Sequence, residues 1–425
     1  MKRVSSIKYQ VSNVLRHPLF SGSLVMIGGS MGVNAVNYLY HVLMGRILGP
    51  IDYGILASLY SIIYLTAIVP ISASVAIVKF ISSAKNQTEA YSIYISLKKF
   101  IFFLALVVSL ILFIASPSIA KFLNITSFWM VSLVSLILFF SLVTLINQAT
   151  SQGLLKFLGN VIPGFISAVV KLTVGLVLIF LGFSVFGAMV GIVVAVILAY
   201  IYSVWFINRV LPKRKSVAYK LRPFFLYSLP VLVQALAFTS LFTTDVILVK
   251  HFLPAFQAGI YAALSTLGRI IYFAASPITA TMFPIVSGRK ARGEGYRKVF
   301  LVSFAVTILL SVAIVLFYWL FPNIAIGVLY GRAYLSAKAE LVWMGVFILF
   351  YTLSYLLVNF SLSLGKVKIV IIPLFFSLIQ IPAIWFFHGT ILQVIQISLV
   401  LSVLLFLLLV LYLGYNWLIE KYGKN

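Results

Sequence analysis

The chain has 425 residues, of which 63% are hydrophobic and only 9% are charged, and its formal net charge is +25. Because about a quarter of the residues of a soluble domain are charged, this composition excludes an ordinary soluble protein. The chain has no cysteine, which excludes disulfides, thiolate metal sites and a cysteine nucleophile.

Hydrophobic runs of about 20 residues recur along the whole chain, and each is long enough to cross a bilayer as a helix. They do not alternate as the strands of a membrane barrel do. The first run is too long for the core of a signal peptide, so it is read as a retained span. We expect an all-α polytopic membrane protein. About twelve spans are predicted, at 22–44, 54–79, 98–116, 128–150, 160–181, 185–207, 224–249, 259–286, 298–320, 339–363, 367–388 and 390–418.

The distribution of basic residues predicts the orientation of these spans. Counted at alternate ends of the spans, 24 Lys and Arg lie on the side of the N-terminus and 5 on the opposite side, with Lys171 and Arg269 inside spans. Cytoplasmic loops carry the excess of Lys and Arg, so both termini are expected in the cytoplasm. The same placement makes anionic lipid headgroups, rather than nucleic acid, the expected partner of the positive charge.

The longest polar connection divides the predicted spans into two sets of six and carries six basic residues. The predicted organisation is a cytoplasmic segment 1–21, a six-helix bundle 22–207, a basic cytoplasmic linker 208–223, a second six-helix bundle 224–418 and a cytoplasmic tail 419–425.

An internal repeat supports two equivalent halves. A shift of 205 residues gives six identities in 32 positions, among them Gly54 with Gly259 and Lys85 with Lys290. An even number of spans per repeat gives both halves the same orientation. We therefore expect a two-fold axis along the membrane normal, with a binding site between the halves near the midplane.

The stretch Gly45–Ala57, with the sequence GRILGPIDYGILA, resembles the start of polysaccharide-biosynthesis flippases, the O-antigen and capsule branch of the multidrug/oligosaccharidyl-lipid/polysaccharide flippase superfamily. Residues 245–261 resemble the junction between the seventh and eighth spans of that family, although Pro254 stands where the family often has glycine.

The resemblance implies two six-helix bundles in a V around a central lumen that opens alternately to either side. It also implies a polyprenyl-diphosphate-linked oligosaccharide as cargo, moved outward across the cytoplasmic membrane. Under this interpretation the chain is a transporter of the cell envelope and not an enzyme. Its partners are the lipid-linked cargo, membrane lipids and other polysaccharide assembly proteins. No cofactor or metal is expected, and a monomer is expected.

Cations inside or next to spans are the main candidates for cargo binding, because charge within a membrane is costly and usually functional. Five residues are predicted to form a cationic track for the diphosphate: Arg46, Lys79, Lys171, Lys250 and Arg269. The alternative treats Arg46, Lys79 and Lys250 as interfacial anchors. For Lys171 and Arg269 the alternative role is structural: each would belong to a buried ion pair or be a cation bound to a carbonyl, without contact to cargo.

Asp245 is the acidic residue clearly within a predicted span. Two roles stay open for it: a site for proton or cation coupling, or the counter-ion of Lys171, Lys250 or Arg269. Several amides are candidate sugar contacts, with hydrogen bonding between helices as the alternative. They are Asn34, Asn37, Gln148 and Gln234, with Asn147, Gln152 and Asn359 as further polar residues within spans.

Two other functions remain open from the sequence. One is a multidrug exporter of the same superfamily coupled to cations, although deep cations with a single acid favour anionic cargo. The other is a membrane-embedded polysaccharide polymerase or acyltransferase, which would normally need a large outer loop or a cluster of acids and histidines. The four histidines form no motif, and no phosphate-binding loop indicates an ATP-driven pump.

Overall fold

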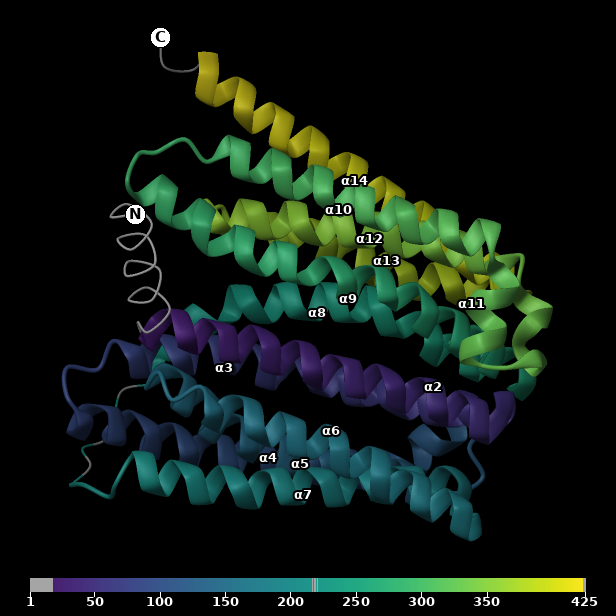
Figure 1. Cartoon of the computed structure of the whole chain (residues 1–425), viewed down its shortest axis with the longest axis horizontal. Coiled ribbons are helices and arrows are strands. Elements are labelled where there is room, and N and C mark those ends of the chain that lie inside the picture. The colour runs from purple at the N-terminus through teal and green to yellow at the C-terminus, as the bar shows by residue number, and fades with distance from the viewer. Residues whose placement is uncertain (1–17, 216, 218, 220, 423–425) are drawn as a thin grey trace, which may run out of the picture. The chain divides into compact units, whose positions relative to one another are not determined.

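The computed structural model describes residues 18–215, 217, 219 and 221–422 (Figure 1). Most of the predicted segment 1–21, three residues of the linker 208–223 and the last three of the tail 419–425 lie outside the described residues. All regular structure in the described part is helical. The helices are α2 (Pro18–Thr66), α3 (Ile68–Ser82), α4 (Gln87–Phe122), α5 (Phe128–Gly153), α6 (Leu158–Leu178), η1 (Ile179–Phe183), α7 (Ser184–Val210), α8 (Arg222–Phe252), α9 (Ala255–Ala291), α10 (Arg297–Leu320), α11 (Pro322–Leu329), η2 (Arg332–Ala337), α12 (Glu340–Ser363), η3 (Val367–Val370), α13 (Ile371–Phe386) and α14 (Ile391–Tyr422).

Ten helical stretches of the described chain are long and apolar enough to cross a membrane. Two of them, Gly28–Ser82 and Leu158–Val210, have 55 and 53 residues, more than twice the roughly 20 that one crossing needs. Each contains a glycine in the left-handed region, Gly49 with φ 71° and Gly182 with φ 92°. Division at these glycines gives twelve crossing segments, in agreement with the sequence.

The second predicted span, 54–79, is not one continuous helix. Helix α2 ends at Thr66 and α3 begins at Ile68, with Ala67 between them. Pro70 explains the break, because proline has no N–H to donate to the carbonyl of Thr66 one turn earlier. A second difference lies in the expected outer loop between residues 320 and 339, which contains the short helices α11 and η2.

The chain divides into two compact units. Of the described residues, unit 1 contains those within 18–41, 66–121 and 125–232, and unit 2 contains those within 42–65, 122–124 and 233–422. Residues 42–65, the end of the first predicted span and the start of the second, thus belong to the same unit as the C-terminal part of the chain. The division at 208–223 stays a prediction from charge and loop length.

Unit 1 is built around α5, which packs against α3, α6 and α7. Its core combines residues of α3, α4, α5 and α7, such as Ile77, Ile93, Leu138 and Ile207. Burial of such aliphatic side chains at helical spacing fixes which face of each helix is turned inward.

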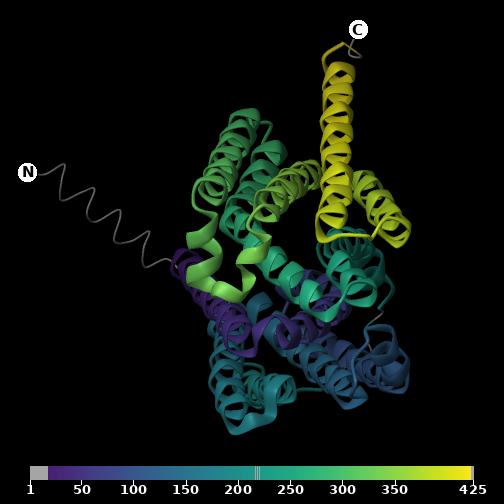
Figure 2. The same cartoon turned by 90° about the vertical axis from the view of Figure 1, so that its right-hand side faces the viewer.

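Unit 2 is built around α12, which packs against α9, α10 and α14. One core cluster joins Met282 and Val286 of α9 to Leu356, Phe360 and Leu364 of α12. Both views of the ribbon show the C-terminal part of α14 leaving the other helices of this unit (Figure 1, Figure 2).

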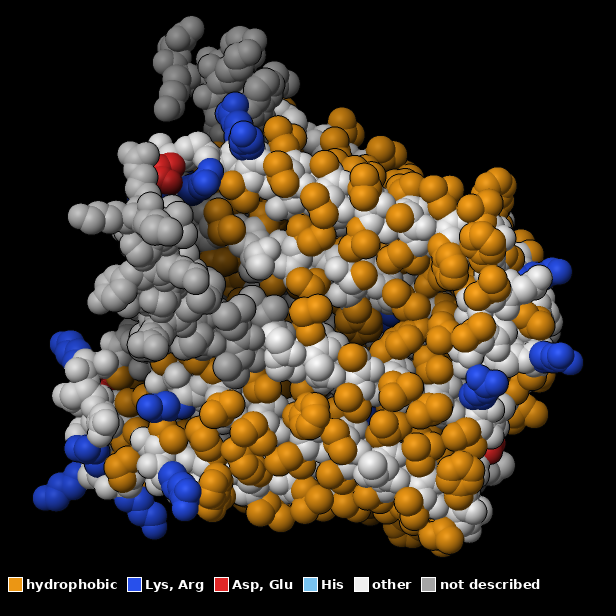
Figure 3. Space-filling model, viewed as in Figure 1, with side chains coloured by type: hydrophobic (Ala, Val, Ile, Leu, Met, Phe, Trp, Pro, Cys, Tyr) orange, Lys and Arg blue, Asp and Glu red, His pale blue; other side chains and the backbone are white. Residues whose placement is uncertain are grey.

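The surface follows the pattern expected of membrane-crossing helices. In Figure 3, hydrophobic side chains cover the middle of the visible helices, and Lys and Arg side chains gather at helix ends. This separation supports a membrane location, because charge at helix ends can reach headgroups and water.

Candidate functional site

Lys171 is the deep cation of unit 1. It lies on the buried face of α6 together with Pro163, Ala168 and Gly175, and only 8% of its surface is exposed. Its Nζ lies 4.7 Å from the centroid of the Tyr40 ring in α2. An ammonium at this distance from an aromatic face is stabilised by the ring quadrupole. Lys171 is therefore held inside the unit and does not extend along the helix surface toward the headgroups.

Close packing of α6 on α7 explains why the backbone at Lys171 is fixed. A methyl group on Gly191 of α7 would come 2.7 Å from the amide nitrogen of Gly175, which lies one turn beyond Lys171. Such a contact is possible only without side chains on both helices, as in small-residue interfaces of membrane helices. The cation is thus attached to a rigid helix pair.

Arg269 is the deep cation of unit 2, with 8% of its surface exposed, and it lies on the buried face of α9. Its Nη2 donates a hydrogen bond of 2.6 Å to the carbonyl oxygen of Phe242 in α8. Its Cζ lies 4.1 Å from the centroid of the Phe242 ring and 5.7 Å from that of Tyr64. Nε has no hydrogen-bond partner among the described residues.

Asp245 is satisfied by hydrogen bonds and not by a contact ion pair. Only 1% of its surface is exposed. Oδ2 accepts a hydrogen bond of 2.6 Å from the hydroxyl of Tyr261, and Oδ1 accepts one of 2.8 Å from the amide of Val246. No described Lys or Arg lies in ion-pair contact with it. The choice between a coupling site and a counter-ion thus stays open for Asp245.

The other three cations of the predicted track differ in their surroundings. Lys250 is buried at the end of α8, with 4% of its surface exposed. Lys79 is exposed in the last turn of α3. Arg46 is also exposed, and its Nη1 donates a hydrogen bond of 3.0 Å to the carbonyl of Val328 in α11. Arg46 and Lys79 thus have the positions expected of interfacial anchors.

The candidate sugar contacts differ in their burial and in their hydrogen bonds. Gln148 of α5 donates from Nε2 to the carbonyl of Asn160 in α6 at 3.1 Å, which is a hydrogen bond between helices. Asn34 is exposed and Asn37 is half-buried, both in α2. The Nε2 of Gln234 in α8 is buried without a hydrogen-bond partner among the described residues. A buried amide without a partner is costly, so Gln234 is the candidate with a donor available for a ligand.

The glycine-rich stretch Gly45–Ala57 is anchored to α9, α11 and η2 within unit 2. The hydroxyl of Tyr53 lies 3.0 Å from Oγ1 of Thr266 and 3.3 Å from the hydroxyl of Tyr330. The hydroxyl of Tyr334 donates to the carbonyl of Gly45 at 2.7 Å. We call these three bonds and the Arg46 bond to α11 the tyrosine clasp. The motif therefore connects helices and does not by itself form a cavity.

The second matched stretch forms the turn from α8 to α9. Pro254 precedes the first residue of α9, with φ −53° and ψ 147°, and its carbonyl accepts a hydrogen bond of 2.9 Å from the amide of Ala258. A fixed φ near −65° suits the residue that precedes a helix. Proline at this position therefore forms the turn in place of glycine.

Aromatic residues around the two deep cations were not predicted from the sequence. Tyr40, Phe242 and Tyr64 supply ring faces, and Tyr261 supplies the hydrogen bond to Asp245. The sequence contains one indication of the contact between Tyr64 and Arg269. The 205-residue shift that pairs Gly54 with Gly259 also pairs Tyr64 with Arg269.

Solved structures with the same fold are membrane transporters. The lipid II flippase MurJ in an inward closed conformation is 14% identical, with a TM-score of 0.74 over 92% of this chain and 87% of that chain. An inward-facing multidrug resistance MATE family transporter of the MOP superfamily is 15% identical, with a TM-score of 0.69 over 91% and 95%. The eukaryotic MATE transporter AtDTX14 is 14% identical, with a TM-score of 0.66 over 92% and 95%. The chain thus has the two-lobed helical fold of these transporters.

Residues 43–339 match the model of a family described as polysaccharide biosynthesis protein. This match covers more than half of the chain, and the chain belongs to that family. No curated protein matches the sequence. Fold and family together define a multi-pass helical membrane protein of the polysaccharide biosynthesis family, as the resemblance at Gly45–Ala57 implied.

Proposed function

We propose that this chain moves a polyprenyl-diphosphate-linked oligosaccharide from the inner to the outer leaflet of the cytoplasmic membrane by alternating access. Membership of the polysaccharide biosynthesis family supports a glycan cargo. The common fold with a lipid II flippase supports the movement of a lipid-linked molecule. The excess of basic residues on one side supports termini in the cytoplasm.

The environment of Arg269 is the observation that most directly supports the proposal. Its guanidinium is buried, and a backbone carbonyl and an aromatic ring hold it without a contacting carboxylate. An ionised group inside a membrane is costly and is usually functional. A guanidinium presents five donors in a planar fork that matches phosphate oxygens. Nε, which has no partner among the described residues, is an available donor for such a ligand.

Lys171 provides a second buried cation, in unit 1. A diphosphate carries several charged oxygens, and it loses its hydration when it enters a membrane protein. Two cations compensate this loss better than one. The ring faces of Tyr40 and Phe242 stabilise the two cations without adding a negative charge.

Substitution of Arg269 tests the proposal. In a host whose own flippase has been deleted, Arg269→Ala is expected to lower surface glycan at least tenfold without a change in the amount of protein in the membrane. Arg269→Lys is expected to restore only part of the export, because an ammonium cannot form the paired bonds of a guanidinium. The matched control is Arg332→Ala, an exposed arginine of η2 in the same unit, which should export normally. Normal export by the double variant Lys171→Ala/Arg269→Ala would overturn the proposal.

A drug exporter coupled to cations is the second candidate, and the buried Asp245 beside Tyr261 favours it. A carboxylate inside a transporter is suited to bind a proton, a metal cation or an organic cation. This candidate predicts that cells with the wild-type chain accumulate less ethidium than cells with Asp245→Asn. Equal accumulation together with restored surface glycan would eliminate it.

A further inference from the structure

An apolar groove lies in unit 2, and neither Arg269 nor Asp245 belongs to its lining. Its volume is about 460 Å³, and its sides come from the start of α10, the end of α12 and the C-terminal part of α14. The C-terminal part of α14, which supplies one side of the groove, diverges from the other helices of the unit (Figure 2). Its lining residues are Tyr296, Arg297, Phe300, Leu301, Phe360, Leu364, Lys366, Val410, Leu413 and Gly414.

The floor of the groove is rigid and hydrophobic. Phe360 and Leu364 are buried, and the ring of Phe300 stacks on that of Phe360 with 4.0 Å between centroids. Leu301 and Val410 at the sides remain exposed. Such a surface suits a hydrocarbon chain, because its walls are apolar and its shape is fixed by the core beneath.

Two cations, Arg297 and Lys366, belong to the lining of this otherwise apolar groove. A turn at the end of α12 fixes Lys366, where the amide of Lys366 bonds to the carbonyl of Ser361 at 3.0 Å and Gly365 has φ 74°. Arg297 begins α10, where a cation is unfavourable for the helix dipole. The helix dipole therefore does not explain the position of Arg297, whereas Lys366 lies just beyond the C-terminus of α12, where a cation is favourable.

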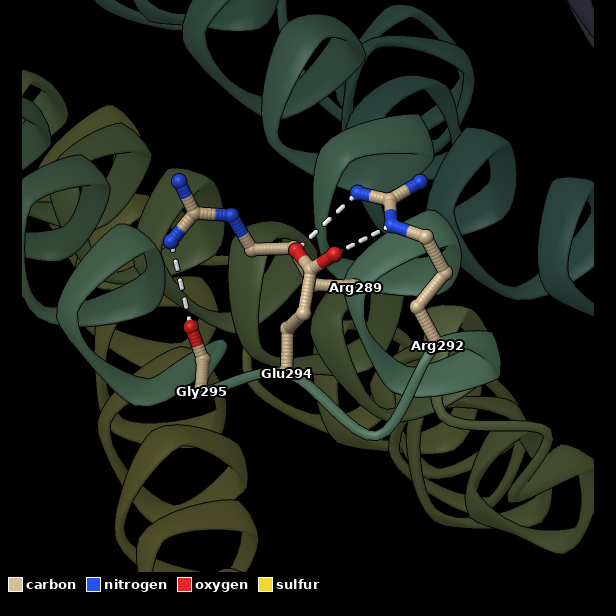
Figure 4. Close-up of polar contacts among 4 residues, drawn as sticks. All are labelled: Arg289, Arg292, Glu294 and Gly295. Carbon is tan, nitrogen blue, oxygen red and sulfur yellow. Dashed lines mark hydrogen bonds and ion pairs between the residues drawn. The ribbon is translucent and has the colours of Figure 1, made fainter.

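The surrounding loops are strongly basic. The segments 289–298 and 366–368 contain seven Lys and Arg and one acid, Glu294. Figure 4 shows that Glu294 is engaged by Arg292, with Nε to Oε1 at 2.5 Å and Nη2 to Oε2 at 3.1 Å. Glu294 is thus paired with a neighbour in its own loop, and these two segments keep an excess of positive charge.

We propose that this groove binds an anionic glycerophospholipid, with its phosphate at Arg297 and Lys366 and an acyl chain along Phe300, Phe360 and Val410. A basic pocket between membrane helices on the predicted cytoplasmic side is the kind of site that recognises such headgroups. The inference is independent of which cargo the transporter carries.

Unit 1 contains a second groove, whose lining differs from that of the first in having no charged residue. A groove of about 360 Å³ between α3, α4, α5 and the start of α8 is lined by apolar residues and two serines, including Phe100, Leu142 and Phe224. None of its lining residues is charged. This groove should accept acyl chains without preference for the headgroup.

Native mass spectrometry of the full chain can test the site. Phosphatidylglycerol and phosphatidylcholine with identical acyl chains are added in equal amounts, and retained lipid is counted per protein. The wild type should retain at least fivefold more phosphatidylglycerol, and Arg297→Ala/Lys366→Ala should reduce this ratio below twofold. The matched control Lys98→Ala/Lys99→Ala removes the same charge in unit 1, beside the uncharged groove, and should keep the wild-type ratio.

A second pair of variants tests the acyl chain. No described heavy atom lies within 4 Å of a methyl group placed on Gly414, which belongs to the groove lining. Gly414→Phe should therefore obstruct the groove and lower phosphatidylglycerol retention with both cations present. Gly28→Phe, at an equally open glycine of α2, is the control. An unchanged ratio in the double alanine variant, or an equal fall in the lysine control, would overturn the proposal. Complete displacement of the lipid by inorganic phosphate or by equimolar polyprenyl diphosphate would also overturn it. Glycan export is not the readout, so failure here leaves the proposed function unaffected.

Discussion

Gly54 and Gly259 pack backbone against backbone although 205 residues separate them. A methyl group on Gly54 would come 2.9 Å from the amide nitrogen of Gly259. The same shift relates Tyr64 to Arg269, whose Cζ lies 5.7 Å from the Tyr64 ring centroid. In a two-fold relation, a residue touches its own equivalent only near the axis. The contacts of α2 with α9 within unit 2 are therefore those expected beside the axis of the sequence repeat.

Gly54→Ala should destabilise the protein by about 1–3 kcal/mol, because the added methyl group meets backbone atoms that cannot move aside easily. Thermal unfolding in detergent measures this effect. The control Gly32→Ala lies in the same helix with no heavy atom within 4 Å of the added methyl, and it should be neutral or slightly stabilising. Equal melting temperatures for Gly54→Ala and the wild type would contradict the close contact.

The predicted orientation can be tested by cysteine labelling, because the wild type contains no cysteine. Lys213→Cys in the basic linker should react with an impermeant maleimide only after the membrane is opened. Ser336→Cys, in η2, should react in intact cells. The reverse pattern would invert the topology inferred from the 24 and 5 basic residues on the two sides.

Asp245→Asn separates the charge of Asp245 from its hydrogen bonds. An asparagine can accept from the amide of Val246 and donate to the hydroxyl of Tyr261, so only the charge is lost. The counter-ion role predicts reduced thermal stability, because the buried Arg269 then loses its counter-charge. The loss should be smaller than the about 3–5 kcal/mol of a broken contact pair.

A second substitution, Arg269→Gln, should restore stability to the Asp245→Asn protein. A different outcome would point to energy coupling: a stable Asp245→Asn protein that binds cargo but transports none in reconstituted vesicles at any ion gradient. That result would remove the counter-charge role.

Glu294 should titrate at a lower pH than an ordinary glutamate. The hydrogen bond from Arg292 lowers the pKa of this carboxyl, and the same bond raises the pKa of the Arg292 guanidinium. Because the pKa of Glu294 is depressed in the folded state, its contribution to stability is present above the unfolded value of about 4.3 and is lost as the pH falls through the folded value. Carbon-13 NMR of labelled glutamate measures the midpoint. Arg292→Gln should return it to the usual range, and a midpoint unchanged by this substitution would contradict the pairing.

Much of the fold followed from the sequence because bilayer thickness and hydropathy fix the length and number of helices. The span boundaries at Gly49 and Gly182 were also readable, since glycine permits the positive φ found there. The break before Pro70 and the helices α11 and η2 were not predicted, because both depend on short local sequence within otherwise apolar or loop-like stretches.

The candidate site was only partly predictable. Hydropathy shows that Lys171 and Arg269 lie deep in spans, since a charge stands out against an apolar background. It does not show which neighbours they meet. The ring of Phe242 and the hydroxyl of Tyr261 become partners only through contacts between helices, and aromatic residues are too common in this chain to be singled out.

The tyrosine clasp stabilises one arrangement of the family motif, residues Gly45–Ala57. Any motion that separates Gly45–Ala57 from α9, α11 and η2 must break the bonds of Tyr53, Arg46 and Tyr334. A single hydrogen bond contributes about 0.5–1.5 kcal/mol. A membrane potential of about 100 mV supplies roughly 2.3 kcal/mol for each charge that crosses. The four bonds of the clasp together contribute about 2–6 kcal/mol. This is similar to the electrical free energy for one or two charges, so movement of the anionic cargo proposed above would suffice to release the clasp.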